Sequence, residues 1–220
     1  TDVYTAEQLQ SVGQGGLAQA LAALVPGFNY PRPSIADGTD HAPPFTLRSL
    51  NPDQVLVLVN GKRLHQSALL HTNGTIGRGS SGADLNTIPL LAVERVEVLR
   101  DGAAAQYGSD AIAGIINIVL KGYGHASQAQ LGWGRTTAGD GLQRQAAVFH
   151  STPLAGDGFI ILTAELRDRG ATDRAAPDAL DGGRINTHFG DADTQDAVLA
   201  WNAEVPRGDT VTAPSSTARV

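Results

Sequence analysis

ADLNTIPLLAVERVEVLRDGAAAQYGSDAIAGIINIVLKG, residues 83–122, is the stretch that decides the fold. Within it, RVEVL places Val96 and Val98 on one face of an extended chain, which is the period-two pattern of a strand. GAAAQYG predicts one or two helical turns that end at Gly108, because glycine readily adopts a left-handed backbone. GIINIVLK reads as a buried strand whose only polar residue before Lys121 is Asn117. Two strands around a short helix therefore form the centre of a small α+β unit.

The residues upstream extend this unit. VLVLV and KRL flank Asn60-Gly61, and this dipeptide between two extended runs is the strongest short hairpin signal. FTLRSL predicts a short alternating strand at residues 45–50. A short helix stopped by Pro26-Gly27 is predicted by apolar residues that share one face: Leu17, Leu21, Leu24 and Val25. We therefore expect a small mixed sheet with short helices from about Val3 to Leu120.

From about Ala126 the pattern changes to long segments with a period of two. FIILTAELRDR is the clearest of these segments. Its apolar residues Ile160, Leu162, Ala164 and Leu166 lie on the face opposite its polar residues Thr163, Glu165, Arg167 and Arg169. SQAQLGWGR and DAVLAWNAEV alternate in the same way, whereas Arg144 interrupts the apolar face of LQRQAAVFH. Alternating segments of about 10 residues with aromatics on the apolar face are typical of outer-membrane β-barrels. A soluble antiparallel sheet alternates too, so this pattern alone leaves both possibilities open.

The connections between these segments differ in length. STPLAGDG and EVPRGDT are short turns, and the polar run between them, residues 170–195, is long. Short periplasmic turns that alternate with longer extracellular loops are the pattern of an outer-membrane barrel.

The stretch from Phe45 to Gly122 resembles the plug domain of TonB-dependent outer-membrane receptors. The resemblance rests on VLVLVNGKRL, on residues 83–122 and, upstream, on LAQALAALVPGFNY. Ser49 departs from the family pattern, which has glycine after the arginine that corresponds to Arg48, and this leaves the local turn uncertain. The resemblance implies a plug domain at residues 1–122, followed at residues 123–220 by the opening antiparallel strands of an outer-membrane β-barrel.

The resemblance also implies a function. It points to TonB-energised uptake of a scarce ligand (an iron chelate, haem, cobalamin or an oligosaccharide) across the outer membrane of a Gram-negative bacterium. The plug would gate the barrel lumen, with its N-terminus in the periplasm and TonB acting on a segment upstream of this chain. The partners implied are the TonB complex, outer-membrane lipid and a small-molecule or chelate cargo. Two alternatives remain: a soluble periplasmic or extracellular ligand-binding module made of the plug-like unit alone, and a signalling receptor with an extra domain before Thr1.

IGRGSSG, residues 76–82, contains the G-x-G-x-x-G pattern of dinucleotide-binding loops. The pattern requires a strand before it and a helix after it, and here Pro89 interrupts any long helix downstream. We therefore interpret Gly74, Gly77, Gly79 and Gly82 as conformational slack in an apical loop that faces the substrate.

Two sets of site residues follow from the resemblance. The apical loops, which lie between the plug strands, supply the expected ligand contacts: Arg32, His41, Asn51, Asp53, His65, Gln66, His71, Asn73 and Arg78. The expected plug–barrel interface consists of charged residues that could equally form a solvated strand face: Arg48, Glu94, Arg95, Glu97, Arg100 and Asp101. We expect that interface to be polar and hydrated, with contacts worth about 0–1 kcal/mol each, so that modest force separates it.

Composition and motifs disfavour other classes of function. The 220 residues carry 16 Lys and Arg against 22 Asp and Glu, a net charge of −6 that disfavours nucleic acid. Cysteine is absent, so disulfides and thiolate zinc sites are excluded. The six histidines show no tight metal-ligand spacing, and Ser80, Ser81, Asp84 and His71 lack the context of a hydrolase triad. We predict no enzymatic activity, no cofactor and no metal site.

After Gly122 the chain has room for about four or five membrane strands, whereas about 22 are needed to enclose a plug. We therefore expect these residues to be a fragment of a barrel, with the strands in an unclosed, curved arrangement. The tail TVTAPSSTARV loses the strand alternation and is expected to be poorly ordered coil.

Overall fold

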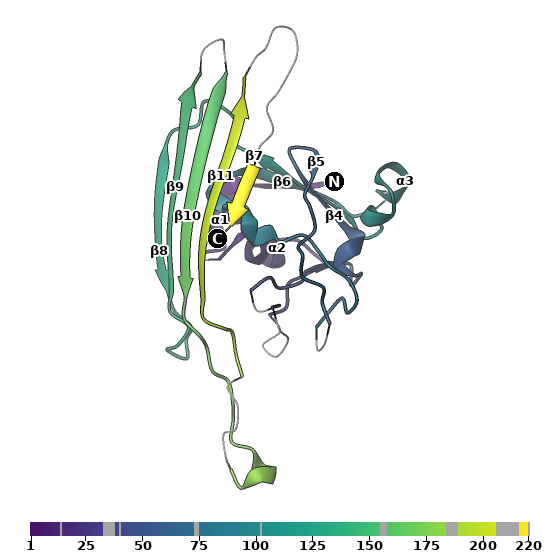
Figure 1. Ribbon diagram of the computed structural model, residues 1–220, viewed down its shortest axis with the longest axis vertical. Helices are drawn as coiled ribbons and strands as arrows, with labels where there is room; N and C mark the ends of the chain where they lie inside the picture. Colours follow the sequence, from purple (N-terminus) through teal and green to yellow (C-terminus); the bar gives the residue numbers. More distant parts are fainter. Residues whose placement is uncertain are drawn as a thin grey trace.

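The computed structural model describes residues 1–13, 15–32, 38–39, 41–72, 75–101, 103–154, 158–183, 189–205 and 216–219. Two five-stranded sheets lie beside each other, one in the plug unit (residues 1–122) and one that we call the wall sheet (Figure 1). The plug sheet has the order β1-β6-β7-β4-β5, and the wall sheet has the order β12-β11-β10-β9-β8. The predicted fold class, a small mixed sheet followed by antiparallel strands, is confirmed.

The plug sheet consists of β1 (Asp2–Thr5), β4 (Val55–Val59), β5 (Lys62–Arg63), β6 (Val93–Leu99) and β7 (Gly114–Leu120). β4 and β7 are parallel and the other pairs are antiparallel, so the sheet is mixed as expected. The predicted hairpin joins β4 to β5, where Asn60 and Gly61 have φ angles of +49° and +75°. The Asn60 Oδ1 also accepts a hydrogen bond from the Leu120 amide at 2.9 Å, which ties the turn to β7.

The described residues of the plug unit form three short helices, of which α1 and α2 pack on the plug sheet. α1 (Ala6–Ser11) begins at a capping box formed by Thr5 and Gln8, and α2 (Leu17–Leu24) is the helix that the sequence predicted. α3 (Ala104–Tyr107) ends at Gly108 with φ +93°. The short 3₁₀ turns are η1 (Pro52–Gln54), η2 (Leu85–Thr87), η3 (Leu90–Ala92), η4 (Ser109–Ala111) and, outside the plug, η5 (Ala179–Asp181).

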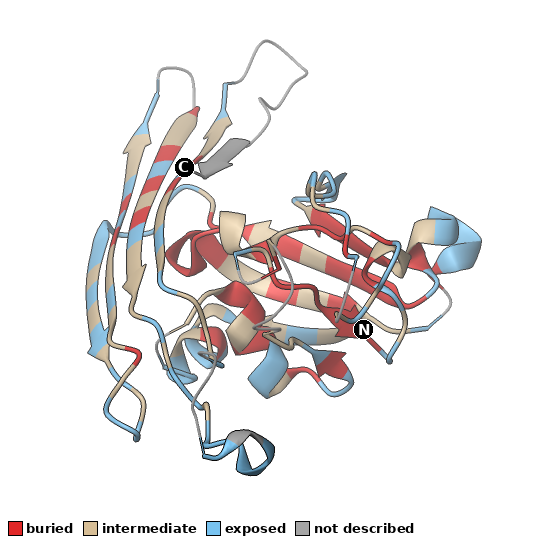
Figure 2. Cartoon of the chain, turned by 60° about the horizontal axis from the view of Figure 1, so that its bottom comes forward, coloured by how far each residue is buried: buried red, intermediate tan, exposed pale blue. Residues whose placement is uncertain are grey.

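The main hydrophobic core lies inside the plug unit. Its buried residues run from Leu9 to Leu120 and pack α1 and α2 against the sheet, so buried residues concentrate there (Figure 2). In the described part of the chain, no helix is both long enough and apolar enough to span a membrane.

The predicted strand at FTLRSL is shorter than expected. Only β3 (Thr46–Leu47) is extended, and it pairs with β2 (Phe28–Asn29). Arg48 and Ser49 follow it with φ angles of +57° and +61°, so the chain makes a left-handed turn there. A glycine adopts this backbone without a steric cost, which gives a physical reason for the glycine of the family pattern; here serine holds the same turn.

The wall sheet consists of β8 (Gln128–Gly134), β9 (Gln143–Pro153), β10 (Phe159–Arg169), β11 (Thr194–Glu204) and β12 (Ser216–Arg219), all antiparallel. In the described residues the sheet is open, with β8 and β12 at its ends. The expectation that the tail is coil is wrong for residues 216–219, because their backbone pairs with β11. The expected disorder of the other tail residues falls outside the described residues.

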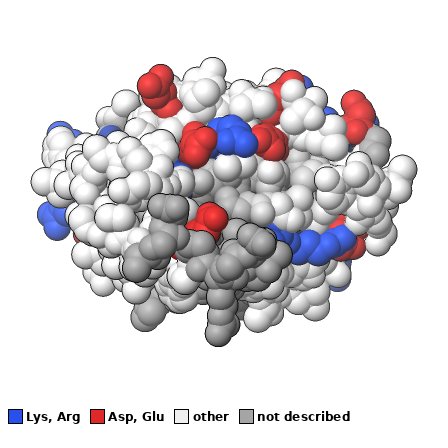
Figure 3. All heavy atoms as spheres, turned by 90° about the horizontal axis from the view of Figure 1, so that it is seen from above, with Lys and Arg blue, Asp and Glu red and all other residues white. Residues whose placement is uncertain are grey.

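The two faces of the wall sheet differ as the alternation predicted. Leu131 and Trp133 point away from the plug and are 86% and 67% exposed, whereas Phe149, Thr163 and Glu165 face the plug and are buried. β10 accordingly shows alternating buried and exposed residues (Figure 2). On the end of the molecule seen from above, acidic and basic side chains lie side by side (Figure 3).

Candidate functional site

Asn86–Leu91, a short segment of the plug unit that we call the docking segment, contacts the wall sheet. It has the sequence NTIPLL and runs from η2 into η3. The Asp84 side chain accepts a hydrogen bond from the Asn86 amide at 2.9 Å and caps η2. Pro89, with φ −61°, precedes η3 and prevents the two turns from merging into one helix. The segment therefore offers backbone groups and the Leu91 side chain to the inner face of β9 and β10, while Leu90 packs in the core of the plug.

Charged side chains of β10 hold the backbone of the docking segment. The Arg167 Nη2 donates to the Asn86 carbonyl at 2.7 Å, and the Leu90 amide donates to the Glu165 carboxylate. Arg167 and Glu165 are also paired at 3.1 Å, and the Asp196 carboxylate lies 3.8 Å from the Arg167 Nε. Side-chain exposures of 14% for Arg167 and 2% for Glu165 exclude most water from this pair. Removing one partner would leave a buried charge uncompensated, so the plug and β10 depend on each other here.

An apolar contact lies beside this charged pair. Leu91 packs with Ala147 and Phe149 of β9 and Ile161 of β10, and all four are at most 4% exposed. The expectation that plug and strands meet through polar, hydrated contacts is therefore wrong at this place. Burying four apolar side chains contributes more than exposed ion pairs of about 0–1 kcal/mol each.

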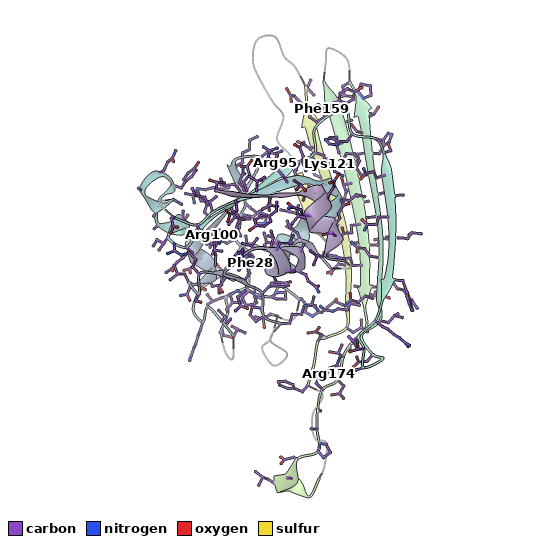
Figure 4. All side chains as sticks on the ribbon, turned by 180° about the vertical axis from the view of Figure 1, so that it is seen from behind. Phe28, Arg95, Arg100, Lys121, Phe159 and Arg174 are labelled. Atoms are coloured by element: carbon purple, nitrogen blue, oxygen red, sulfur yellow. The ribbon has the colours of Figure 1, made fainter. Side chains whose placement is uncertain are left out.

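Lys121, which follows β7, links the plug sheet to the wall sheet. Its Nζ lies 4.8 Å from the centre of the Phe149 ring and donates to the Gln128 Oε1 at 3.0 Å. Its carbonyl accepts a hydrogen bond from the Asn202 Nδ2 at 3.2 Å, so β11 is tied to the same point. Only 4% of the residue is exposed, and burial lowers the pKa of the Lys121 ammonium. Figure 4 shows Lys121 between the plug sheet and the wall strands.

Two of the predicted ligand residues, Arg32 and His41, line a cleft between the plug and the wall sheet. The Arg32 guanidinium binds Asp191 at 3.0 Å and Gln19 at 2.7 Å, which connects the plug to the long loop between β10 and β11. Tyr30 lies in the same cleft, and burial raises the pKa of its hydroxyl. The cleft has a volume of about 80 Å³, whereas pockets for drug-sized ligands measure about 300–1,000 Å³. A cleft of this volume has room for a few waters or for one small group of a larger ligand.

The glycines of IGRGSSG have a packing role that the sequence did not indicate. A Cβ on Gly77 would lie 2.4 Å from the Pro52 Cδ, and one on Gly82 would lie 2.8 Å from the Pro52 Cβ. The interpretation of these two glycines as conformational slack is therefore wrong, because they let the loop pack on a proline ring. Gly79 has φ +85° with open space around it, and Gly74 lies outside the described residues. The next element after this loop in the described residues is the short 3₁₀ turn η2, not an α-helix. The interpretation of the loop as a nucleotide-binding site therefore stays rejected.

The remaining ligand candidates lie in two neighbouring loops, around η1 and at residues 64–82. His65 and Arg78 are exposed, Gln66 accepts a hydrogen bond from Ser81 at 3.1 Å, and His71 is only 2% exposed. A buried His71 is a loop-core residue, and burial lowers the pKa of its imidazole. Asn51 is exposed before η1, and Asp53 has one buried carboxylate oxygen without a hydrogen-bond partner. Asn73 lies outside the described residues.

These loops are adjacent to one another. The Pro52 contact joins η1 to residues 77–82, and a Cβ on Gly38 would lie 2.8 Å from the Leu69 Cδ1. The loops lie at the lower end of the plug in Figure 1, the same end as the long connection between β10 and β11. The structure thus brings the predicted ligand residues to one end of the plug, and their role in binding stays a prediction.

The predicted interface residues have their partners mostly inside the plug unit. Arg95 lies between Glu94 and Glu97, at 2.9 Å from each, and Arg48 binds Asp101 at 2.9 Å. Arg100 pairs with Asp2, and Glu94 lies 3.9 Å from His125 in the connection to β8. A hydrogen bond from Asn117, together with Arg95, lowers the pKa of Glu97. The contacts with the wall strands described above come instead from the docking segment and from Lys121, and the interface role of these charged residues stays a prediction.

The loops at the lower end of the wall sheet are also linked. Arg174 binds Asp140 at 2.5 Å and so connects the β10–β11 loop to the β8–β9 loop. The Arg174 hydrogen bond, with others from Thr136 and the Asp173 amide, lowers the pKa of Asp140. Figure 4 shows Arg174 at the base of the long loop that leaves the wall sheet.

The described residues assemble no metal cluster, and Ser80 of the rejected triad is engaged elsewhere. They contain no group of three His, Cys, Asp or Glu side chains placed to hold a metal ion. Ser80 donates its hydroxyl to the Gly77 carbonyl at 2.6 Å, so it serves the loop.

Comparison with known families agrees with this architecture. The family described as TonB-dependent Receptor Plug Domain matches residues 1–115. The chain belongs to this family. The relatives below are named as receptors and transporters, in line with the prediction of no enzymatic activity.

Named relatives and solved structures extend the match past the plug. The vitamin B12 transporter BtuB of Vibrio vulnificus is 28% identical over 178 residues, which is 81% of this chain and 26% of that protein. The ferric enterobactin receptor of Pseudomonas aeruginosa is 30% identical over 129 residues, 59% of this chain and 17% of that protein. The fold of the chain also matches the crystal structure of the ferric enterobactin receptor PfeA, with a TM-score of 0.71 at 21% sequence identity. This match covers 94% of this chain and 31% of the PfeA chain. The crystal structure of the siderophore receptor PirA of Acinetobacter baumannii matches with a TM-score of 0.66 at 22% sequence identity. The match covers 94% of this chain and 29% of the PirA chain. The chain thus spans about a quarter or less of the length of these curated relatives.

Proposed function

We propose that this chain is the plug and first wall strands of an outer-membrane receptor for TonB-energised uptake of a scarce ligand. The observation that carries the proposal is the docking of Asn86–Leu91 on the inner face of β9 and β10, while the outer face of the same strands is apolar and exposed. A wall with a plug on one face and apolar side chains on the other suits a barrel in lipid. The exposed outer rows disfavour the alternative of a soluble ligand-binding module.

The orientation in the membrane forms part of the proposal. β9 ends at Pro153 and β10 begins at Phe159, at the end of the wall sheet opposite the start of the long β10–β11 loop (Figure 1). We place this end at the periplasmic side and the long loop outside the cell, as in other outer-membrane barrels. The edge strand β1 then leads from Thr1 into the sheet, where a pull by TonB on an upstream segment would act on its pairing with β6.

The cargo is a chelate or cobalamin-sized molecule, because the relatives with similar sequences are named for vitamin B12 and ferric enterobactin. The contacts we propose are those of the adjacent apical loops: Arg32, His41, Asn51, Asp53, His65, Gln66, Asn73 and Arg78. His71 is buried and would support its loop rather than touch the cargo. The small cleft beside Arg32 would take only one group of such a molecule.

An engineered disulfide that can be reduced tests the proposal. The chain has no cysteine, so Leu91→Cys with Ala147→Cys in the complete receptor would place a single disulfide across the docking contact. We expect cargo binding to persist, TonB-dependent uptake by cells to fall at least tenfold, and a reductant to restore it.

The matched control is a disulfide within the wall. Val148 and Ala164 are register partners on the outer face of β9 and β10, so Val148→Cys with Ala164→Cys links the strands without touching the plug. Uptake by this variant should equal that of the parent. Normal uptake by the locked plug, or uptake independent of TonB, would exclude the proposed function.

A further inference from the structure

The turn between β4 and β5 contains a chemically labile pair of residues. Asn60 and Gly61 suit this turn because both of their φ angles are positive, at +49° and +75°. The same pair is prone to deamidation, because glycine has no side chain that shields its amide nitrogen from the carboxamide of the preceding asparagine. Both residues are exposed, so water reaches the turn.

Deamidation at this turn would proceed through a five-membered succinimide ring. The Gly61 nitrogen attacks the Asn60 Cγ and loses its proton, and the side-chain nitrogen of Asn60 leaves as ammonia. Water then opens the ring at one of its two carbonyl carbons and leaves aspartate or isoaspartate at position 60. The isoaspartate adds one carbon atom to the backbone of the turn, which would shift the register between β4 and β5.

Asn117 of β7 binds the nitrogen that would attack. The Gly61 N–H donates to the Asn117 Oδ1 at 3.1 Å. The Asn117 Nδ2 donates to the Glu97 Oε2 at 2.9 Å, and the Arg95 Nε donates to the other oxygen of that carboxylate at 2.9 Å. Because an ionised carboxylate only accepts hydrogen bonds, Glu97 orients the Asn117 carboxamide with its NH₂ toward β6 and its oxygen toward Gly61.

The side chain of Asn60 is held in place as well. Its Oδ1 accepts a hydrogen bond from the Leu120 amide at 2.9 Å, and its own amide donates to the Ile118 carbonyl at 2.9 Å. These two partners are backbone groups of β7, whereas the bond to Gly61 depends on the side chain of Asn117. Asn117 is the polar residue within the apolar strand GIINIVL, and its bond to the turn gives a physical reason for its presence there.

We propose that Asn60-Gly61 is a latent deamidation site and that Asn117 protects it by holding the Gly61 N–H. The Gly61 nitrogen must give up this proton before the ring can close, so its bond to the Asn117 Oδ1 has to break first. Loss of one such hydrogen bond changes the rate by about fivefold. The inference concerns the plug sheet alone and does not depend on the proposed transport function.

Peptide mapping of the complete receptor, incubated in detergent at mildly alkaline pH, tests the proposal. The chain has a second Asn-Gly pair, Asn73-Gly74, which serves as an internal reference. Trypsin cuts after lysine and arginine, so the two pairs fall in separate peptides, residues 49–62 and 64–78. Mass spectrometry of these peptides gives the deamidation rate of each asparagine.

We expect Asn117→Ala to deamidate at Asn60 about fivefold faster than the parent, and Gly61→Ala added to it to abolish the increase. Glu97→Ala frees the Asn117 carboxamide to turn and leaves β7 intact, so it should raise the Asn60 rate by a smaller factor. This variant also tests the proposal if Asn117→Ala fails to fold. The rate at Asn73 should be the same in all of these proteins.

Val119→Ala is the matched control, because Val119 lies two residues further along β7, is half-buried like Asn117 and has a side chain that cannot hydrogen-bond. Asn60 should deamidate at the parental rate in this variant. An equal increase in Val119→Ala and Asn117→Ala would assign the protection to the packing of β7 and overturn the proposal. So would a parental rate in Glu97→Ala and Asn117→Ala, or a folded parent that deamidates at Asn60 as fast as the chain unfolded in guanidinium chloride.

Discussion

Gly114 begins β7 with φ +139°, in a place where no side chain fits. A Cβ there would lie 2.4 Å from the Leu99 carbonyl oxygen and 2.9 Å from the Leu47 Cδ2. The first of these atoms belongs to the β6 backbone and cannot move without breaking the sheet. Gly61, by contrast, has φ +75° but open space around it. Substitutions at the two glycines therefore distinguish a steric clash with neighbouring atoms, at Gly114, from the cost of a positive φ angle alone, at Gly61.

We predict that Gly114→Ala lowers the free energy of unfolding of the plug by about 2–4 kcal/mol, and Gly61→Ala by only about 1 kcal/mol. Because the main core lies between Leu9 and Leu120, urea unfolding of residues 1–122 provides the measurement. Equal losses for the two variants would show that the close approach at Gly114 is relieved by a small shift of the strands.

His71 gives the loop at residues 64–82 a pH dependence. Its pKa in the folded loop lies below the ordinary 6.5, so between those two values the unfolded loop binds more protons than the folded one. The stability of the loop is therefore full above about pH 6.5, falls as the pH drops toward the folded pKa, and then levels off.

The amide of Gly79 reports this loss, because it donates to the His71 carbonyl at 2.8 Å. We expect its hydrogen exchange, corrected for intrinsic rates, to accelerate between pH 7.5 and pH 5 in the parent and in a His65→Gln control. His71→Gln should remove the pH dependence. An unchanged pH profile in His71→Gln would assign the effect to another group.

The docking segment is the structural feature on which the proposed gating depends. Leu91→Ala removes an apolar side chain that is 4% exposed and leaves a cavity against Phe149 and Ile161. We predict that docking weakens by about 2–4 kcal/mol and that the Leu90 amide, which bonds Glu165, exchanges correspondingly faster in the complete receptor. Leu131→Ala, on the opposite face of the wall, should leave that amide unchanged, and equal exchange in all three proteins would contradict the assignment.

The sequence predicted the elements that have local signals. Asn60-Gly61 specifies its hairpin through positive φ angles, and the period of two in β10 assigns its faces correctly. The docking segment was missed because turns around Pro89 have no periodicity and resemble any loop. Glu165 and Arg167 were assigned to the polar face of β10, but nothing local distinguishes a plug-binding pair from lumen-facing charges. Residues 216–219 were missed because their pairing depends on β11.

In the molecule as a whole, the wall sheet separates two environments. Its inner face is covered by the plug, and its outer face exposes Leu162, Leu166 and Leu199. In water, residues 1–220 would leave these rows and the edges at β8 and β12 uncovered. We predict that residues 1–122 elute from size-exclusion chromatography as a monomer, whereas residues 1–220 self-associate unless detergent is present. Monomeric elution of both without detergent would argue against a lipid-facing wall.

Strand β10 is proposed to face lipid on one side and the docked plug on the other. Nitroxide labels at Leu162→Cys, Thr163→Cys, Ala164→Cys and Leu166→Cys, one at a time in the complete receptor in membranes, test it most directly, because the chain has no cysteine of its own. We expect the labels at positions 162, 164 and 166 to collide with dissolved oxygen, as lipid-exposed sites do. The label at position 163 should be inaccessible both to oxygen and to a water-soluble nickel chelate. Equal accessibility of all four labels, or collision of the label at position 166 with the nickel chelate at the rate of a surface loop, would contradict the account.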